Sequence, residues 1–392
     1  MTPIRDNEAL AAFCARQRGA DFVAVDTEFM RERTFRPQLC LVQVAGPEES
    51  AAIDPLAEGI DLAPLHAMMA DQATLKVFHA ARQDIEIFYQ LGGTVPAPIA
   101  DTQVMAMVLG FGEAASYETL ASKLAGARID KTQRFTNWSH RPLSDRQIAY
   151  AMSDVIPLRK VYERLEKKLD KAGRADWVQD EMAVLTDPGT YRVDPDSAWE
   201  RLRPRTNKPR YLAVLRAVAG WREAEADRRN LPRNRVLRDD TLLDVAGQAP
   251  TTAEALSRAR GIPRGFAESR AGTDLMAAIA AAEALPESEC PQLPPRPIGV
   301  NGTGPLIDLL KVLLKMRCET NEVAQKLVAS TADLELIAAN DRADVPALQG
   351  WRRDIFGNDA LALKRGTLGL AVVNDRIRTI DLTRSPNGAQ TP

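Results

Sequence analysis

The chain has 392 residues, of which 45% are hydrophobic and 27% are charged, and its formal net charge is −2. This composition is ordinary for a globular protein of two or three domains, and any polyanion partner would have to meet a local cluster of charge. No apolar run approaches the roughly 18 residues of a membrane helix, the first residues lack a signal-peptide core, and four cysteines lie scattered without a C-x-x-C pair. We therefore expect a cytoplasmic protein that does not enter a membrane.

The first hundred residues predict an α/β fold. Three predicted strands follow one another before any crossover helix, which favours an antiparallel meander, and alternating strands and helices come next. Together these indicate a mixed sheet flanked by helices. The predicted strands are 22–26, 38–44, 51–55, 75–79 and 99–102, and the predicted helices are 7–18, 62–70 and 82–91.

Two carboxylates lie one residue apart at the end of the first predicted strand. Asp26 and Glu28 should point to the same face, because strand side chains at i and i+2 do so. Hard oxygen ligands of this kind suit Mg²⁺ or Mn²⁺ better than Zn²⁺. A lone D-x-E is also typical of a strand that leaves the core into a polar turn, so further acidic residues are needed to indicate a metal site.

Two further carboxylates occur later in the chain. Asp84 lies near the first turn of the helix predicted after the fourth strand, where an acidic residue can also simply favour the helix dipole. Tyr150 and Asp154 share one face of a long helix that begins at Ser144, with Gln147 completing a capping box. Tyr150 alone also fits an amphipathic boundary position, but the occurrence of all these residues in this order favours one catalytic site.

A polar loop at 130–139 carries two cations and two aromatic residues. Lys131 and Arg134 suit phosphate, and Phe135 or Trp138 suits stacking on a base of single-stranded nucleic acid. A surface loop pinned by one buried aromatic explains the same residues equally well, and both interpretations stay open.

The middle of the chain is locally basic. From Arg201 to Arg238 there are 12 Lys or Arg residues and 3 Asp or Glu residues, so the local charge is +9. Such an excess favours a phosphate-facing surface, although a charge run is also typical of a solvated face. The candidate RNA contacts are Arg228, Arg229, Arg233 and Arg235.

The motifs resemble those of the ribonuclease D family, in the DEDD exonuclease superfamily. The resemblance rests on V-D-T-E-F at 25–29, H-A-x-x-x-D at 79–84 and Y-A-x-x-D-V at 150–155. A fourth stretch, 221–237, is similar to the HRDC module that follows the nuclease in that family. The tyrosine four residues before the last aspartate resembles the tyrosine branch of the superfamily.

This resemblance implies a ribonuclease H-like exonuclease domain followed by all-α domains, and a 3′-5′ exoribonuclease that releases 5′-mononucleotides. It implies two divalent ions, Mg²⁺ or Mn²⁺, the first held by Asp26, Glu28 and Asp154 and the second by Asp26 and Asp84. Tyr150 is implied to orient the attacking water.

The implied partners are RNA 3′ ends, such as those of tRNA precursors, and we expect a monomer. Further RNA contacts are expected from motif residues beside the carboxylates, namely Thr27, Phe29 and His79.

The expected domain boundaries follow from these features. They are an exonuclease domain at 1–185, a linker at 186–206, an HRDC domain at 207–288, a proline-rich linker at 289–302, a second HRDC-like domain at 303–372 and a disordered tail at 373–392. The helices predicted in the two helical domains are 212–230, 241–246, 251–259 and 265–284, then 306–317, 321–327, 331–339 and 347–356.

Two other functions would use the same residues. A DNA 3′-5′ exonuclease of the proofreading or Werner type would have the same metal-binding carboxylates, but no polymerase or helicase motif follows. A non-catalytic RNA-binding protein is disfavoured, because all four carboxylates and Tyr150 are present.

Overall fold

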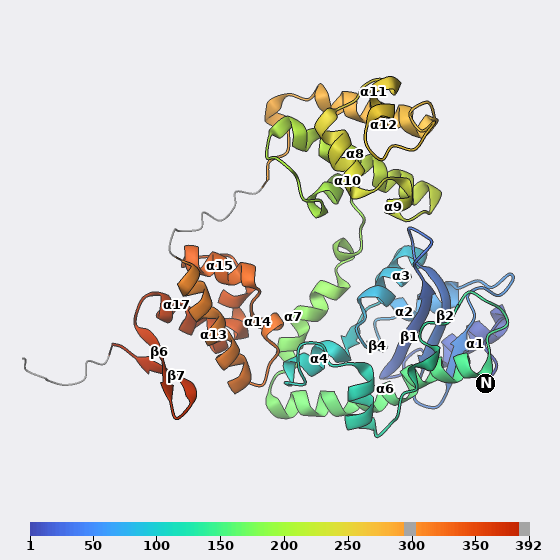
Figure 1. The fold of residues 1–392 in the computed structure, drawn as a ribbon. Helices are drawn as coiled ribbons and strands as arrows, with labels where there is room; N and C mark the ends of the chain where they lie inside the picture. The colour runs from blue at the N-terminus through green and yellow to red at the C-terminus, as the bar shows by residue number, and fades with distance from the viewer. Residues whose placement is uncertain (294–302, 384–392) are drawn as a thin grey trace, which may run out of the picture.

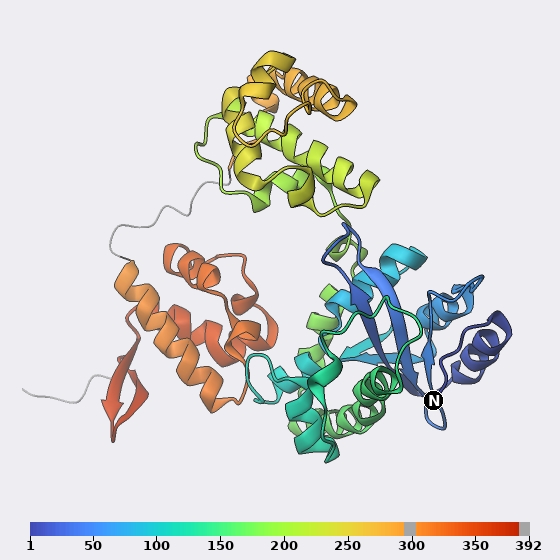
Figure 2. The same cartoon turned by 45° about the vertical axis from the view of Figure 1, so that its right-hand side comes forward.

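The computed structural model describes residues 1–293 and 303–383, which fold into a sheet unit followed by two helical units (Figure 1). The first helical unit stands over one end of the sheet, as the turned view also shows (Figure 2). Within the described ranges, no helix is long and apolar enough to cross a bilayer.

The sheet unit is built on five strands in the order β3-β2-β1-β4-β5. β1 pairs antiparallel with β2, and β2 pairs antiparallel with β3. β4 joins the other side of β1 in parallel and pairs in parallel with β5. This mixed sheet confirms the predicted fold class, with bounds β1 Phe22–Met30, β2 Gln38–Ala45, β3 Ser50–Ile53, β4 Leu75–Phe78 and β5 Ile99–Asp101.

Helices cover both faces of the sheet, so β1 lies at the centre of the unit. Val23 and Val25 pack with residues of α1, α2 and α3 on one face. Ala24 points the other way and packs in a core that includes α4 and α6. Asp26 and Glu28 share the parity of Ala24 and therefore face α6. The bounds are α1 Asn7–Gln17, α2 Ala63–Ala70, α3 Arg82–Gly92, α4 Thr102–Val108 and α6 Asp145–Ala172.

The first strand is longer than predicted. It continues to Met30, which pairs with Gln38, and its register shifts between Glu28 and Phe29. The two carboxylates therefore lie within β1 rather than at its end, because pairing with β2 keeps the backbone extended past Asp26.

α6 begins with the predicted capping box, in which Ser144 and Gln147 cap each other. It ends at Gly173 in the left-handed conformation, and α7 (Ala175–Thr186) follows where the sequence suggested no helix. α7 joins the second helical unit, because Trp177 stacks on Trp351 with ring centroids 4.2 Å apart.

The two helical units differ in how they are packed. The first has its own core, whereas the second shares a core with α4 and α6 of the sheet unit. The first helical unit contains α8 Pro209–Arg229, α9 Arg233–Val236, α10 Asp239–Gln248, α11 Ala253–Arg258 and α12 Arg270–Glu283. The second contains α13 Gly304–Thr320, α14 Gln325–Val328, α15 Thr331–Ala339, α16 Gly350–Arg352 and α17 Asn358–Lys364. The short helix α5, Tyr117–Leu120, belongs to the sheet unit.

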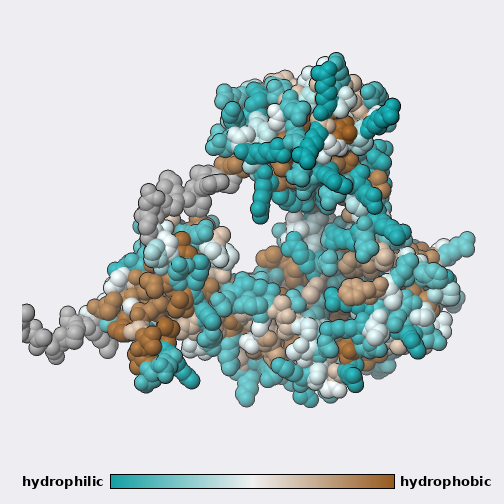
Figure 3. Space-filling view, viewed as in Figure 1, coloured by the Kyte–Doolittle hydropathy of each residue, from teal (hydrophilic) through white to brown (hydrophobic). Residues whose placement is uncertain are grey.

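The expectation of a disordered tail from residue 373 is wrong as far as residue 383. β6 (Leu368–Val373) pairs antiparallel with β7 (Arg376–Asp381), and both residues of the intervening turn, Asn374 and Asp375, have positive φ. Such a two-residue turn matches the twist of a hairpin. Apolar surface gathers over this hairpin and its surroundings (Figure 3), where exposed residues include Val372, Val373, Ile377, Ile380 and Leu382. Residues 294–302 of the predicted linker and residues 384–392 of the predicted tail lie outside the described ranges.

Candidate active site

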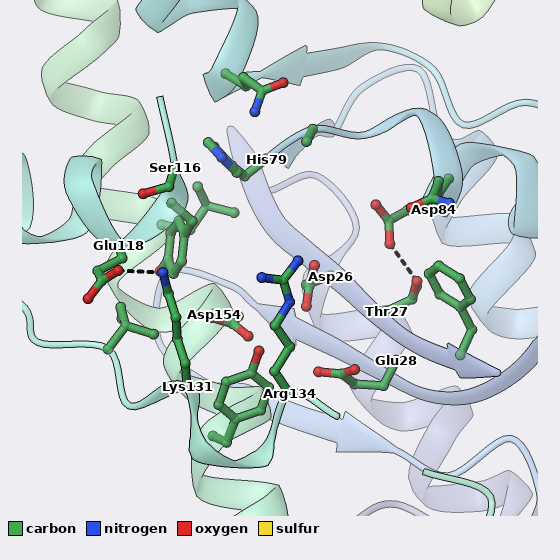
Figure 4. A pocket seen from close by; sticks show the side chains of 18 of the residues that line it. Asp26, Thr27, Glu28, His79, Asp84, Ser116, Glu118, Lys131, Arg134 and Asp154 are labelled. Carbon is green, nitrogen blue, oxygen red and sulfur yellow. Dashed lines mark hydrogen bonds and ion pairs between the residues drawn. The ribbon is translucent and has the colours of Figure 1, made fainter. Parts of the chain in front are cut away.

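A cleft with a volume of about 550 Å³ opens where β1, α3 and α6 meet the loop at 130–139. Polar side chains from all four segments point into it (Figure 4). The sequence motifs at 25–29, 79–84 and 150–155 therefore come together in one place, although they are far apart in the chain.

Three of the predicted carboxylates form a tight cluster. Asp26, Glu28 and Asp154 each offer an oxygen, and these oxygens lie within 4.8 Å of one another. The strand places the first two on one face, and α6 packs across that face and supplies the third. Asp84 reaches the same cleft from the first turn of α3. It is buried and accepts a hydrogen bond of 2.5 Å from Thr27 Oγ1.

Burial raises the pKa of all four carboxyl groups. The pKa of Asp26 lies well above its usual range because the side chain is buried and faces three other acids. Burial and repulsion from Asp154 and Asp84 raise the pKa of Glu28 to about 9. Burial raises the pKa of Asp84 and that of Asp154 to about 7. A site that crowds carboxylates in this way favours bound protons or bound cations.

Tyr150 lies on α6 one turn before Asp154 and also lines the cleft. Burial and the neighbouring carboxylates raise its pKa above the usual range of a phenol. The hydroxyl therefore stays protonated at neutral pH and can donate a hydrogen bond, but it is a poor base.

The other motif residues also lie at the cleft. Thr27 anchors Asp84, and Phe29 contributes part of the wall. His79 Nδ1 lies 3.0 Å from Thr102 Oγ1, and burial lowers the pKa of His79, so the ring is neutral at pH 7.

Two residues that shape the cleft were missed in the sequence. Asp101 accepts hydrogen bonds from the backbone N–H groups of Ala80 and Ala81, and it thereby holds Ala80 at a φ of 59°. The Tyr117 ring lies tilted against that of His79, with ring centroids 5.7 Å apart, and its hydroxyl donates to the carbonyl of Ser153. Neither residue belongs to a motif, and both contacts are long-range, so no local signal marked them.

The loop at 130–139 has two cations that line the cleft and one aromatic residue that is buried, so each of the two interpretations left open by the sequence holds in part. Lys131 and Arg134 line the cleft, and Lys131 pairs with Glu118. Trp138 is only 2% exposed and packs against Tyr150, so its predicted role in base stacking is wrong. Phe135, which is 90% exposed, is the aromatic residue available for stacking.

The four predicted RNA-contacting arginines lie on α8 and α9, outside this cleft. Arg228 and Arg229 pair with Glu225, and Arg233 pairs with the buried Glu223. Other cations of the basic run pair with acids beyond it, as Arg205 does with Asp244. Arg235 is exposed and has no ion pair within the described residues. The pairs with acids beyond the run make the free charge of this surface smaller than the local +9 suggests.

Two family models match this chain, one in the sheet unit and one in the first helical unit. A family model described as a 3′-5′ exonuclease matches residues 1–170, which contain the whole cleft. A second, described as an HRDC domain, matches residues 211–279 in the first helical unit.

Individual relatives agree over nearly the full length. Ribonuclease D of Granulibacter bethesdensis is 53% identical over 97% of this chain and 96% of its own length. Ribonuclease D of Acidiphilium cryptum is 52% identical over 97% of both chains. The crystal structure of Escherichia coli RNase D, an exoribonuclease involved in structured RNA processing, matches with a TM-score of 0.80 and 29% identity over 93% of this chain and 99% of that one. These relatives are ribonucleases, which favours the RNA alternative over the DNA alternative, and the chain belongs to the ribonuclease D family of 3′-5′ exoribonucleases.

Proposed function

We propose that the enzyme hydrolyses the last phosphodiester bond at an RNA 3′ end with the help of two divalent ions, Mg²⁺ or Mn²⁺, and releases 5′-mononucleotides. The observation that carries this proposal is the cluster of Asp26, Glu28 and Asp154 within 4.8 Å. None of these carboxylates has an ion-pair partner among residues 1–293 and 303–383.

The residues present fit divalent cations. Clustered carboxylate oxygens are the ligands that Mg²⁺ and Mn²⁺ prefer, and the raised pKa values show that no protein cation fully compensates their charge. Asp26, Glu28 and Asp154 would hold one ion, and Asp26 with Asp84 would hold the other. When bound, such ions acidify water and stabilise charge on the attacking and leaving oxygens.

The chain's own residues position the reactants. Thr27 donates a hydrogen bond to Asp84 Oδ1, which fixes the position of the carboxyl group and favours its ionised form. Tyr150, protonated at neutral pH, donates a hydrogen bond that orients the attacking water. Arg134 points among the carboxylates (Figure 4), and its charge lowers the pKa of Glu28 and that of Asp154 against the larger effect of burial. The same guanidinium suits a non-bridging phosphate oxygen of the substrate.

The substrates we propose are the 3′ ends of tRNA precursors and other small structured RNAs, on which the enzyme acts as a cytoplasmic monomer. Support for the substrate class comes from the description of the similar E. coli enzyme. Lys131 and Phe135 at the cleft suit the phosphate and base of a single-stranded 3′ tail. All four cysteines are free and buried, in keeping with a reducing compartment.

The test is a 5′-labelled RNA hairpin with a short 3′ tail, incubated with Mg²⁺, with Mn²⁺ or with chelator, beside its DNA counterpart. We expect a ladder that shortens from the RNA 3′ end only with metal, and 5′-mononucleotides as the product. Asp26→Asn should abolish the ladder, whereas Asp21→Asn, an exposed acid just before β1, should leave it unchanged. Cleavage by wild type in chelator, or by Asp26→Asn at the wild-type rate, would refute the proposal.

A further inference from the structure

A second cavity, of about 370 Å³, lies where the sheet unit meets the first helical unit. One wall is the segment 31–37, which joins β1 to β2, and the other comes from the residues just before α8 and from α8 and α9. Figure 1 shows α9 near this segment, and Arg233 of α9 contacts Phe35 of the segment. The volume is about ten times the roughly 30 Å³ share of a water molecule, so the cavity has room for a larger group.

Specific contacts hold the two walls together. Arg36 forms a two-point ion pair with Asp227, with Nε to Oδ1 at 2.6 Å and Nη2 to Oδ2 at 2.8 Å. Asn230 Oδ1 accepts hydrogen bonds of 3.1 Å from the backbone N–H groups of Phe35 and Arg36. The Arg233 guanidinium lies 4.6 Å from the centre of the Phe35 ring. The cavity is therefore a built feature of the junction rather than a gap between loosely placed units.

Two polar atoms of the cavity lining are buried without a partner. Arg222 is only 3% exposed, and its Nη1 donates to Leu237 and Asp239, but its Nε has no hydrogen-bond partner in the described part of the chain. Thr34 Oγ1, on the opposite wall, is likewise buried and unpartnered. A buried donor left unsatisfied costs about 1–3 kcal/mol, so a small shift of the lining that brings either atom to an acceptor in the cavity would be favourable.

The charge of the lining favours an anion. Four arginines, Arg31, Arg201, Arg222 and Arg233, face one carboxylate, Asp239. Glu86 pairs with Arg31, and Glu223 pairs with both Arg201 and Arg233. When these two acids and Asp239 are counted against the four arginines, an excess of one positive charge remains. Arg201 is the most available donor, because its side chain is 58% exposed and its pair with Glu223 is a long 3.4 Å.

We propose that this cavity binds a backbone phosphate of the RNA substrate, upstream of the nucleotide being removed. The cavity begins at Arg31, three residues beyond Glu28, so the Cα atoms of these two residues lie within about 10 Å of each other. Guanidinium groups bind phosphodiesters with paired hydrogen bonds, and phosphate contacts of this kind position a strand without reading its sequence. The inference rests on the proposed function, since the ligand is part of the same RNA.

The test compares a long RNA with an unphosphorylated dinucleotide, whose single phosphodiester is the scissile one and which therefore has no upstream phosphate. In Arg201→Ala the ratio of kcat/KM for long RNA to kcat/KM for dinucleotide should fall about tenfold. The salt dependence of long-RNA binding should become shallower by about 0.7 in log-log slope, the value for one lost contact to a single strand. Glu223 keeps Arg233 as its partner, so this variant should fold. Thr34→Val, which removes one acceptor and donor while nearly keeping the shape, should lower the same ratio.

The matched control is Arg258→Ala on α11, a 74% exposed arginine outside both cavities, which should behave as wild type. An unchanged ratio and salt slope in Arg201→Ala, with active wild type, would overturn the phosphate assignment alone. Inactive wild type on both RNAs would overturn the proposed function and this inference with it. If inorganic phosphate raises the melting temperature of wild type but not of Arg201→Ala, while the RNA ratio stays unchanged, the cavity holds free anions and the RNA assignment is wrong.

Discussion

Replacing Thr27 by valine isolates the role of one hydrogen bond in the proposed metal site. Thr27 Oγ1 donates to Asp84 Oδ1 and stabilises the ionised carboxylate, while burial already raises the pKa of Asp84 to about 7. A hydrogen bond to a charged group contributes about 1.5–3 kcal/mol, and 1.36 kcal/mol corresponds to one pKa unit. Thr27→Val should therefore raise the pKa of Asp84 by a further one to two units, roughly.

The assay is the pH dependence of kcat/KM at limiting Mn²⁺. A divalent ion needs the deprotonated carboxylate, so the acidic limb should move to higher pH by about the same amount. Activity near pH 6 should fall about tenfold or more, and saturating metal should reduce the loss. The control is Thr74→Val, since Thr74 is equally buried but bonds to the backbone of Gly19 away from the cleft. If the two variants have superimposable pH profiles, the hydrogen bond does not tune the site.

Three further outcomes follow from the structure. Trp138→Ala should lower the free energy of unfolding, measured by chemical denaturation, by about 3–5 kcal/mol, because Trp138 is buried. Phe135→Ala should weaken RNA binding without changing stability, because Phe135 is exposed. The reverse pattern would contradict these two assignments. In chelator, the melting temperature should fall as pH rises from about 5 to 9, because the raised carboxyl pKa values mean that the folded state binds more protons than the unfolded state. Added Mg²⁺ should remove the slope, and a flat profile in chelator would contradict the raised carboxyl pKa values. Arg233→Ala should destabilise the protein by about 3 kcal/mol at most, because it strips a two-point partner from Glu223, which is 1% exposed and keeps only its longer pair with Arg201. Arg235→Ala, measured in parallel, should leave stability unchanged.

Short-range geometry predicted which of the candidate carboxylates share a face, whereas their meeting in one cleft was predicted by the resemblance to the ribonuclease D family. Asp26 and Glu28 share a face through the two-residue period of a strand, and Asp154 shares a helix face with Tyr150. The cap of α6 at Ser144 is likewise a local pattern and was confirmed. Local rules could not foresee that β1 would extend past Asp26, since that depends on its register with β2.

The nucleic-acid contacts were harder to predict because they depend on what surrounds each side chain. The spacing of Phe135 and Trp138 does not reveal which one enters the core, and packing against Tyr150 decides it. The basic run has a charge of +9 along the chain, yet some of its arginines pair with acids outside the run that the helical fold brings near, as Arg222 does with Asp239 and Arg205 does with Asp244. The hairpin at the end was missed because its turn, Asn374-Asp375, lacks the usual glycine.

The central claim is that four carboxylates on β1, α3 and α6 form one site for two metal ions. Anomalous diffraction from crystals grown with Mn²⁺ tests it most directly. We predict two peaks, one among Asp26, Glu28 and Asp154 and one between Asp26 and Asp84, and the loss of only the second in Asp84→Asn. No peak in the cleft, or a single peak that survives Asp26→Asn, would contradict the account.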